Sequence, residues 1–420
     1  MKKHILFVTV ILAFWPAKTK AQFAFTRVVS TATPVPGGTG TFGLMTYPGT
    51  DGQTVYFNGA DQAGRSGVFG GTGGPLTTVA DWTTPIPSVG GSFEFVNRPN
   101  VSSGRVAFSG GSATVSGLYL ASGGTVQRIA DTTVPLPGGG GLFSSFGSYS
   151  VGSWGVAFRA NAQTAADGIY RQTAAGLSAV ATFQTPLPNG GGSTFKSLDL
   201  PAADATGVTF YGSNQKSGEA SRSGIYRADG SGEIQAVIST TDIDPGSGTR
   251  YAAFGQQAVN SAGQMAVVAE SAAGAYVSLR FWTGVQWTTL AASGTPVPGT
   301  PNAHFDSFHP SVSLDEYGNV AFHADDDSGN SGIYLASGGQ LVKVVDVNTP
   351  IDEGKTPLDE YSLGLADNLM AGGKLAFYAV TAPGKFGIYL TSVPEPATGW
   401  LLGLGTACLL WRRNGRGKQR

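Results

Sequence analysis

Three of the four histidines lie close together in the chain and are followed by consecutive aspartates. They are His304, His309 and His323, followed by Asp325, Asp326 and Asp327. Imidazole and carboxylate groups both bind divalent metals, so a metal site is one interpretation. The spacing, however, matches neither the HExxH pattern nor the D-x-[DN]-x-[DN]-G calcium loop. A solvated acidic loop beside surface histidines is the favoured interpretation, so we expect no metal and no cofactor. His323 and the three aspartates remain candidates for binding another ligand.

Other catalytic patterns are missing from the sequence. There is neither a GxSxG nucleophile elbow nor a phosphate-binding P-loop. Glycine-rich strings such as PGGTGTFG precede an expected strand, so they lack the helix N-terminus that binds phosphate. The sequence therefore assigns no catalytic residue.

Tryptophan side chains are the second kind of candidate, because exposed aromatic rings can stack on sugars. Trp282 and Trp287 flank the turn at Thr283-Gly284, and we expect them to form a cross-strand pair. Trp82 lies in a connection between two repeats and is the candidate for contacting a ligand.

The composition excludes some partners and favours a β-rich fold. Charged residues are 13% of the chain and the net charge is -1, so nothing favours binding to nucleic acid. The 63 glycines and 23 prolines make up about a fifth of the residues, below the share typical of disorder, and aromatic residues reach 10%. These values indicate a packed, turn-rich β protein.

A repeat of 50 to 56 residues runs through the chain. Its clearest marker is a Thr-Pro-x-Pro turn, found with variants seven times, at Thr33, Thr84, Val134, Thr185, Thr241, Thr295 and Thr349. Four strand-like runs, here named A to D, follow each turn. Strand A begins at an aromatic residue, namely Phe42, Phe93, Phe143, Phe195, Tyr251, Phe305 or Tyr361. Strand B has the type G-x-V-A-F, and strand C the type G-[IVL]-[YF]. The fifth copy lacks the strand C pattern, and we expect Leu279 or Phe281 to take the aromatic position there.

Four antiparallel strands at this spacing predict an all-β, seven-bladed β-propeller over residues 22–391. The last copy ends after strand C at residues 387–390, whereas an unassigned strand, FTRVVS at residues 25–30, precedes the first copy. We expect this N-terminal strand to close the last blade, which would remove the exposed sheet edges. An open β-solenoid is the alternative, but it leaves the N-terminal strand unexplained.

The connections divide into two kinds. The proline turns fix the backbone and are expected to link one blade to the next. The B-to-C loops emerge on the same face and differ from copy to copy, as binding loops on a rigid scaffold do. We therefore expect a ligand to bind on this loop-rich face.

The N-terminus indicates export. Lys2 and Lys3 precede an apolar run at residues 5–15, and small residues at Thr19 and Ala21 favour cleavage before Gln22. Residues 1–21 therefore predict a signal peptide. The only cysteine, Cys408, lies near the C-terminus, so the propeller has no disulfide.

The tail at residues 392–420 combines three features. Val393-Pro394-Glu395-Pro396 is followed by an uncharged apolar segment at residues 397–411 and then by Arg412 and Arg413. Fifteen helical residues reach about 22 Å, which is short of a bilayer core of about 30 Å. We expect a short helical membrane segment that is held transiently, with a retained inner-membrane anchor as the alternative.

This combination resembles the PEP-CTERM sorting signal. The resemblance implies processing by an exosortase in the inner membrane and delivery to the cell envelope or the extracellular space, often in bacteria that make exopolysaccharide. The repeats also resemble tandem-repeat proteins with an NxxGxxAF-type motif. The nearest copies are NSAGQMAV at residues 260–267 and DEYGNVAF at residues 315–322.

Together these features predict an exported cell-surface or matrix protein that binds a glycan or a surface protein. The alternative is a secreted propeller enzyme acting on polysaccharide, because a propeller can gather catalytic groups from several blades.

Overall fold

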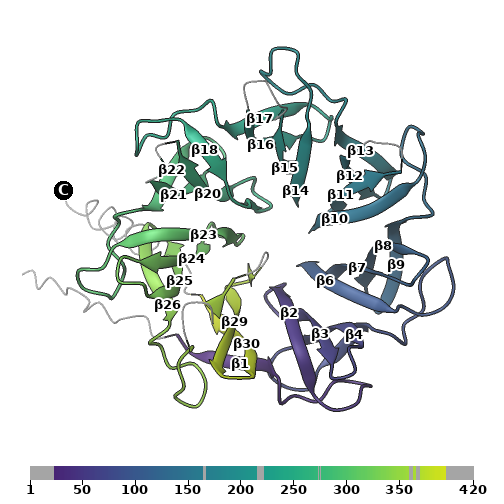
Figure 1. Ribbon diagram of the computed structural model, residues 1–420, viewed down its shortest axis with the longest axis horizontal. Coiled ribbons are helices and arrows are strands. Elements are labelled where there is room, and N and C mark those ends of the chain that lie inside the picture. Colours follow the sequence, from purple (N-terminus) through teal and green to yellow (C-terminus); the bar gives the residue numbers. More distant parts are fainter. Residues whose placement is uncertain are drawn as a thin grey trace, which may run out of the picture.

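The computed structural model describes residues 23–393 except 164–166, 215–221, 273, 275, 359–362 and 366–368. Within them every element is a β-strand, and no helix is long and apolar enough to cross a membrane. The strands form seven sheets around a central axis (Figure 1). The predicted seven-bladed propeller is confirmed. The expected signal peptide, the helical segment at residues 397–411 and most of the tail, including Pro394, Glu395, Pro396, Arg412 and Arg413, lie outside the described residues.

The blades follow one another along the chain. Blade 1 contains β2 (Phe42–Thr50), β3 (Val55–Asp61), β4 (Ser66–Gly71) and β5 (Thr77–Ala80). Blade 2 contains β6 (Phe95–Ser102), β7 (Arg105–Gly111), β8 (Ser116–Ser122) and β9 (Thr125–Asp131). Blade 3 contains β10 (Phe143–Gly152), β11 (Gly155–Ala162), β12 (Gly168–Thr173) and β13 (Gly176–Thr182). Blade 4 contains β14 (Ser197–Ala203), β15 (Val208–Ser213), β16 (Ser223–Ala228) and β17 (Ile234–Ser239).

Blades 5, 6 and 7 have the same strand order as the first four. The inner strand is divided into two short strands in blade 5 and in blade 7. Blade 5 contains β18 (Tyr251–Phe254), β19 (Ala258–Val259), β20 (Met265–Ser271), β21 (Val277–Trp282) and β22 (Trp287–Ala292). Blade 6 contains β23 (Phe305–Leu314), β24 (Val320–Asp326), β25 (Ser331–Ser337) and β26 (Gln340–Asp346). Blade 7 contains β27 (Leu363–Gly364), β28 (Met370–Ala371), β29 (Lys374–Ala382), β30 (Lys385–Ser392) and β1 (Phe25–Ser30).

The N-terminal strand closes the ring, as expected. β1 pairs antiparallel with β30, with Phe25 opposite Thr391 and Ser30 opposite Gly387, and Figure 1 shows the purple β1 against the yellow β30. The Phe25 ring meets Phe377 edge-on at 5.6 Å between centroids. This closure excludes the open solenoid. β30 continues to Ser392, two residues past the expected end of strand C.

A cluster of three aromatic rings, one each from strands A, B and C, fills the middle of most blades. In blade 2 the edge of Phe93 points at Tyr119, at 4.8 Å, and Tyr119 stacks on Phe108. Blades 1, 3, 4 and 6 repeat this arrangement. The glycine of the G-[IVL]-[YF] pattern is required where the ring folds back over it: a Cβ at Gly67 would lie 2.8 Å from the Phe69 ring. In blade 7, Tyr361 lies outside the described residues.

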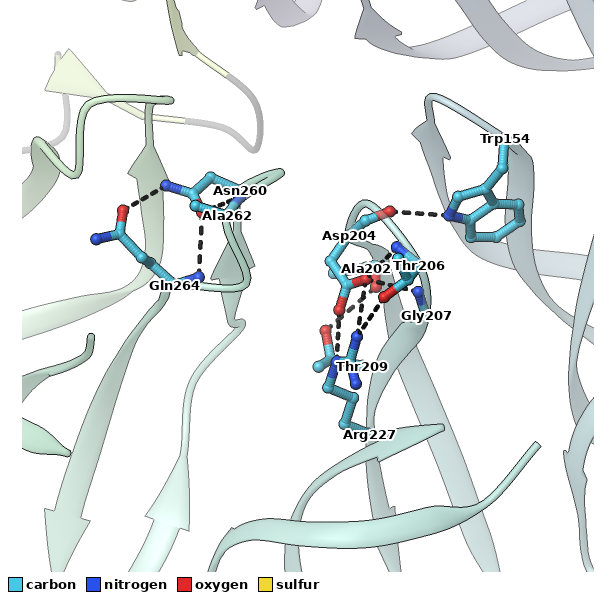
Figure 2. Close-up of polar contacts among 10 residues, drawn as sticks. All are labelled: Trp154, Ala202, Asp204, Thr206, Gly207, Thr209, Arg227, Asn260, Ala262 and Gln264. Carbon is cyan, nitrogen blue, oxygen red and sulfur yellow. Dashed lines mark hydrogen bonds and ion pairs between the residues drawn. The ribbon is translucent and has the colours of Figure 1, made fainter. Parts of the chain in front are cut away.

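The recurring Asn/Asp-x-x-Gly sequence closes the A-to-B turn. Asn260 Oδ1 accepts the backbone N–H groups of Ala262 and Gln264, and Asp315 Oδ1 does the same for Tyr317 and Asn319. Gly263 and Gly318 have positive φ angles of 75° and 83°, which favour glycine. Figure 2 shows the Asn260 turn beside the equivalent turn at Asp204, whose carbonyl accepts the indole N–H of Trp154 from the preceding blade. The Asn/Asp-x-x-Gly sequence therefore stabilises the A-to-B turn.

Blade 5 departs from this plan in its proline turn. The residue that bridges to the start of strand A is Pro34 in blade 1 and Pro85 in blade 2, but Ile243 here. The expected match of Thr241-Asp242 to Thr-Pro was therefore wrong by one residue. The correct register puts Asp244 at a position that is apolar and buried elsewhere. The equivalent residues are Val35, Ile86, Leu136, Leu187, Val297 and Ile351.

A second substitution accompanies the first. Strand C of blade 5 places Arg280 opposite Val267, where the other blades place Phe or Tyr, so the expectation of Leu279 or Phe281 was wrong. Asp244 and Arg280 are both buried, and Arg280 Nη1 lies 4.0 Å from Asp244 Oδ1. Ser278 replaces the glycine, which is possible because no aromatic ring folds over it. Arg280 Nε, Asp244 Oδ2 and the Ser278 hydroxyl have no hydrogen-bond partner in the structure.

This buried pair generates a stability prediction. Asp244→Val should lower the free energy of unfolding by about 3–5 kcal/mol, because it leaves the Arg280 charge buried without its carboxylate. The triple variant Asp244→Val, Ser278→Gly, Arg280→Tyr restores the arrangement of the other blades and should regain that loss or exceed the natural chain. Urea unfolding of the three proteins measures both changes. A single variant as stable as the natural chain would contradict the buried pair.

Ring closure generates a second prediction. Deleting residues 22–31 should lower the melting temperature of the whole domain, because it removes the buried Val28 and Val29 and frees the edge of β30. Arg27→Ala is the matched control, since its ion pair with Asp352 is exposed and should matter little. A deletion variant that melts like the natural chain would show that β1 is dispensable.

Candidate functional site

The inner strands carry a bulge at the same point in several blades. The pairing of strand A with strand B shifts between Thr46 and Gly49, Asn97 and Asn100, Phe146 and Tyr149, Asp199 and Ala202, and Phe308 and Val312. A proline follows the first residue of the bulge in four blades, as Tyr47-Pro48, Arg98-Pro99, Leu200-Pro201 and His309-Pro310. Tyr47, Arg98 and Leu200 have φ angles of 50°, 53° and 51°, which are strained for residues with a Cβ. The bulges turn these side chains out of the regular alternation.

The bulges surround a pocket on the propeller axis. It has a volume of about 500 Å³ and is lined by residues from all seven blades. The lining includes Leu44, Tyr47, Pro48, Arg98, Pro99, Asn100, Ser148, Tyr149, Pro201, Gln256, Ser311, Leu365, Tyr378 and Phe386. We call it the axial pocket. Most of its lining residues lie near the middle of the inner strands, at the bulges. Phe386, at the start of β30 directly after the B-to-C turn of blade 7, also lines it, so the pocket is on the side of the D-to-A and B-to-C connections.

Tyr47 and Arg98 form a pair at this pocket. The Arg98 guanidinium lies over the Tyr47 ring, 5.2 Å from its centroid, and the Tyr47 side chain is well exposed. Arg98 makes no ion pair in the part of the chain that the structure describes. It is also the only charged group among the described residues lining the pocket. The pair thus offers an aromatic face and an unpaired cation side by side.

Tyr149 fixes the floor beneath this pair. Its hydroxyl accepts the backbone N–H of Ser109 at 2.9 Å and donates to the Arg98 carbonyl, so it links blades 2 and 3. Burial raises the pKa of Tyr149, and it stays protonated. Its role is to hold the Arg98 bulge in place.

A side pocket opens from the axial pocket between blades 6 and 7. Its volume is about 200 Å³, and it shares Ser311, Leu365 and Tyr378 with the axial pocket. His309 and His323 line it, with their rings stacked at 3.7 Å between centroids and 12° between planes. The bulge of β23 produces this contact, because it leaves residues 309–311 without a partner opposite His323.

Asp325 completes the cluster, two residues after His323 on the same face of β24. Its carboxylate lies 3.3 Å from His309 Nε2 and accepts a 2.8 Å hydrogen bond from Ser307 Oγ. His323 Nε2 lies 2.6 Å from the Ser331 hydroxyl. We call His309, His323 and Asp325 the two-histidine cluster.

Burial decides the protonation of this cluster. Burial and, to a smaller extent, the neighbouring His309 lower the pKa of His323 to about 3, although the Asp325 carboxylate opposes this shift. Burial alone would raise the pKa of Asp325, but hydrogen bonds from His309, Ser331 and Ser307 hold it well below its usual range. At neutral pH the cluster therefore holds a neutral buried imidazole beside a carboxylate.

The other candidates from the sequence have separate surroundings. Asp326 is buried and accepts the backbone N–H groups of Ser328 and Asn330, so it closes the B-to-C turn. Asp327 is exposed and contacts His304 Nδ1 at 3.2 Å. Only His323 and Asp325 of the four candidates in blade 6 belong to one cluster.

The tryptophans occupy different positions. Trp82 lies in the connection between blades 1 and 2, where the Arg65 guanidinium covers its ring at 4.7 Å. Arg65 in turn pairs with the buried Asp61 at 2.6 Å, so this cation is satisfied. Trp282 and Trp287 are opposite each other on β21 and β22, as expected, with ring centroids 5.5 Å apart.

Tyr47, Arg98 and His309 were not connected with one another from the sequence. A signal existed, because each precedes a proline at the same point of its repeat. That recurrence marks a bulge, but its meaning depends on the inner strands converging at the axis.

Comparisons with known proteins identify the tail. The model of the PEP-CTERM protein-sorting motif matches residues 392–414, which confirms the interpretation of the tail and indicates an exported protein sorted by an exosortase. A model described as a family of unknown function, DUF7453, matches residues 111–277. The NxxGxxAF resemblance stays a prediction. No curated protein matches the chain.

Several solved structures are distantly similar. A polysaccharide lyase, Uly1, is 11% identical with a TM-score of 0.47, covering 87% of this chain and 97% of its own. A prolyl endopeptidase is 12% identical with a TM-score of 0.44, covering 84% of this chain, which spans only 50% of that enzyme. The Aleuria aurantia lectin in complex with alpha-methyl-L-fucoside is 11% identical with a TM-score of 0.31. The match covers 89% of this chain and 96% of the lectin. These similarities are too low to indicate an activity.

The buried imidazole generates a pH prediction. The unfolded chain takes up a proton at His323 near pH 6.5, whereas the folded protein does so only near pH 3. The unfolded state therefore binds more protons between these values, so stability present above pH 6.5 is lost as the pH falls. The slope contributed by His323 should approach about 1.4 kcal/mol per pH unit between about pH 6 and pH 5.

Urea unfolding as a function of pH measures this slope. His323→Gln should remove the His323 contribution to the slope, which corresponds to about one proton. His304→Gln, at an exposed histidine, should leave the slope unchanged. Equal slopes in the natural chain and in His323→Gln would show that the imidazole is accessible to protons in the folded state.

Proposed function

We propose that this exported protein binds an acidic glycan, with a sugar ring on Tyr47 and a sugar carboxylate at Arg98. The observation that carries the proposal is the Arg98–Tyr47 pair, an unpaired cation on an exposed aromatic ring at the axial pocket. Aromatic rings bind the apolar faces of sugars, and guanidinium groups bind carboxylates in a bidentate manner.

The rest of the lining supports this choice. Asn100, Gln256 and Ser311 offer amide and hydroxyl groups to sugar hydroxyls, while Leu44, Leu365 and Phe386 form apolar walls. Because Arg98 is the only charged lining residue described, an anionic ligand meets no opposing carboxylate. A volume of about 500 Å³ suits one end of an oligosaccharide better than a protein surface.

Backbone strain is a further argument. Tyr47 and Arg98 both have left-handed backbone conformations, which cost on the order of 1–3 kcal/mol each. Glycine would remove that cost at either position, so the strain supports a functional use of these two side chains. The sorting tail directs the protein to the cell envelope or the extracellular space, so the protein would bind its ligand there. Exopolysaccharide is a glycan expected in that location.

The two-histidine cluster favours a second candidate, an enzyme acting on polysaccharide. The neutral imidazole of His323 and Tyr378 line the side pocket, which joins the axial pocket where the sugar chain would bind. The Asp325 carboxylate contacts His309, another lining residue. Such groups can move a proton during cleavage of a glycosidic linkage. In this candidate Asp325 and His309 would act on a chain held by Tyr47 and Arg98.

Binding of a uronic acid oligosaccharide, compared with its carboxyl-reduced form, tests the proposal by calorimetry. Tyr47→Ala and Arg98→Ala should each weaken binding roughly tenfold or more, a change of about 1.4 kcal/mol, whereas Tyr47→Phe should bind normally. The carboxyl-reduced sugar should bind weakly and be insensitive to Arg98→Ala.

Trp82→Ala is the matched control, because Trp82 belongs to a similar arginine–aromatic pair whose arginine is already ion-paired. Loss of binding in Trp82→Ala but not in Tyr47→Ala would transfer the site to the outer loops. Release of new sugar ends, abolished by Asp325→Asn, would favour the enzyme, and saturable binding without turnover would favour the binding protein.

A further inference from the structure

The two-histidine cluster has a ligand chemistry of its own, which does not depend on the proposed glycan site. His309, His323 and Asp325 each offer a ligand atom, and these atoms all lie within 4.8 Å of one another. Two imidazoles and one carboxylate are the donors that first-row divalent metals bind, and calcium prefers oxygen donors. We propose that this cluster binds one divalent transition metal ion, for which zinc is the probe.

The backbone brings the three donors together from two strands. His323 and Asp325 alternate by two residues on β24, so both face the same side. The bulge of β23 then places His309 against them. The arrangement differs from the second histidine–aspartate contact of this blade, His304 with Asp327, which is exposed and has no third donor among the described residues.

The surroundings of the donors suit a metal. His323 is buried, and His309 and Asp325 are partly buried, so the three donors lie in a partly enclosed site. Ser307 and Ser331 hydrogen-bond to Asp325 and His323, as second-layer groups around metals commonly do. No lysine or arginine is among the described residues lining the side pocket.

The spacing requires a small adjustment. With bonds of about 2.0–2.2 Å in tetrahedral geometry, donors lie about 3.4 Å apart, closer than the widest separation here. The His309 side chain is 42% exposed and lies in the bulge, so it is the group that can move inward. A metal would replace the direct contact between His309 Nε2 and Asp325.

Three protein ligands leave a coordination position open. It would face the side pocket lined by Pro310, Leu363 and Tyr378, and that pocket joins the axial pocket. Sites with three protein ligands usually keep a water or a substrate oxygen in the fourth position. The metal would therefore be accessible to a small molecule in the axial pocket.

Zinc titration of the purified full chain tests the proposal. Isothermal calorimetry should show one zinc ion per chain at this site, with a rise in melting temperature, and calcium should give neither effect. His309→Ala and Asp325→Asn should weaken zinc binding at least tenfold. Because His323 is buried, His323→Ala would report on folding as well as on zinc binding, so the half-exposed His309 is the decisive position.

His304→Ala and Asp327→Asn are the matched controls and should bind zinc like the natural chain. Cobalt offers a second readout, since its visible absorption should report imidazole ligands and should vanish in His309→Ala. Zinc binding that survives both His309→Ala and Asp325→Asn, or no binding at millimolar zinc, would overturn the proposal. Glycan binding by the chelator-treated protein would remain a separate result.

Discussion

Pairing of β1 with β30 is the interaction on which the architecture depends. The first strand of the chain completes the last blade and so closes the ring of seven sheets. Closure covers the edge of β30 and holds seven inner strands around the axial pocket. Contacts between neighbouring blades reinforce it. Asn260 Nδ2 donates to the Asp315 carbonyl, and the Met370 N–H donates to Ser313, each from one blade to the next.

Within the ring, neighbouring side chains of one strand face opposite sides of the sheet. On strand B, Phe322 joins the aromatic cluster of its own blade, and the next residue, His323, faces the side pocket toward blade 7. Phe377 and Tyr378 divide their roles in the same way. Chemistry can therefore vary at the second position without disturbing the blade core. Blade 5 differs, because there the charged residues Asp244 and Arg280 occupy positions in the blade core.

The bulges convert this scaffold into a site. A regular inner strand would alternate its side chains between two faces, whereas the bulge points one extra residue toward the axis. Tyr47, Arg98 and His309 occupy this position in three blades and differ in chemistry. The axial pocket thus combines an aromatic face, a cation and access to the two-histidine cluster. The sorting motif of the C-terminal tail indicates export of this protein to the cell envelope or the extracellular space.

Much of this protein could be predicted from the sequence, because its signals are local and repeated. The period of the turns, the aromatic residues of each strand, the unpaired strand at residues 25–30 and the sorting tail depend on neighbours in the chain. The Trp282–Trp287 pair followed from a two-residue turn in the same way. The one-residue error at Thr241 arose because Asp242 takes the place of the threonine that caps the turn elsewhere.

Only the tertiary structure decided which residues meet. Tyr47 and Arg98 are far apart in sequence, and the recurring proline that marks each bulge does not show which side chains the bulges bring together. His309 meets His323 because of such a register shift, and Asp326 and Asp327 leave that cluster because a turn begins at Asp326. A shift of one residue moves a strand's side chains to the opposite face. Local patterns therefore specify the blades, and the register and closure of the sheets specify the site.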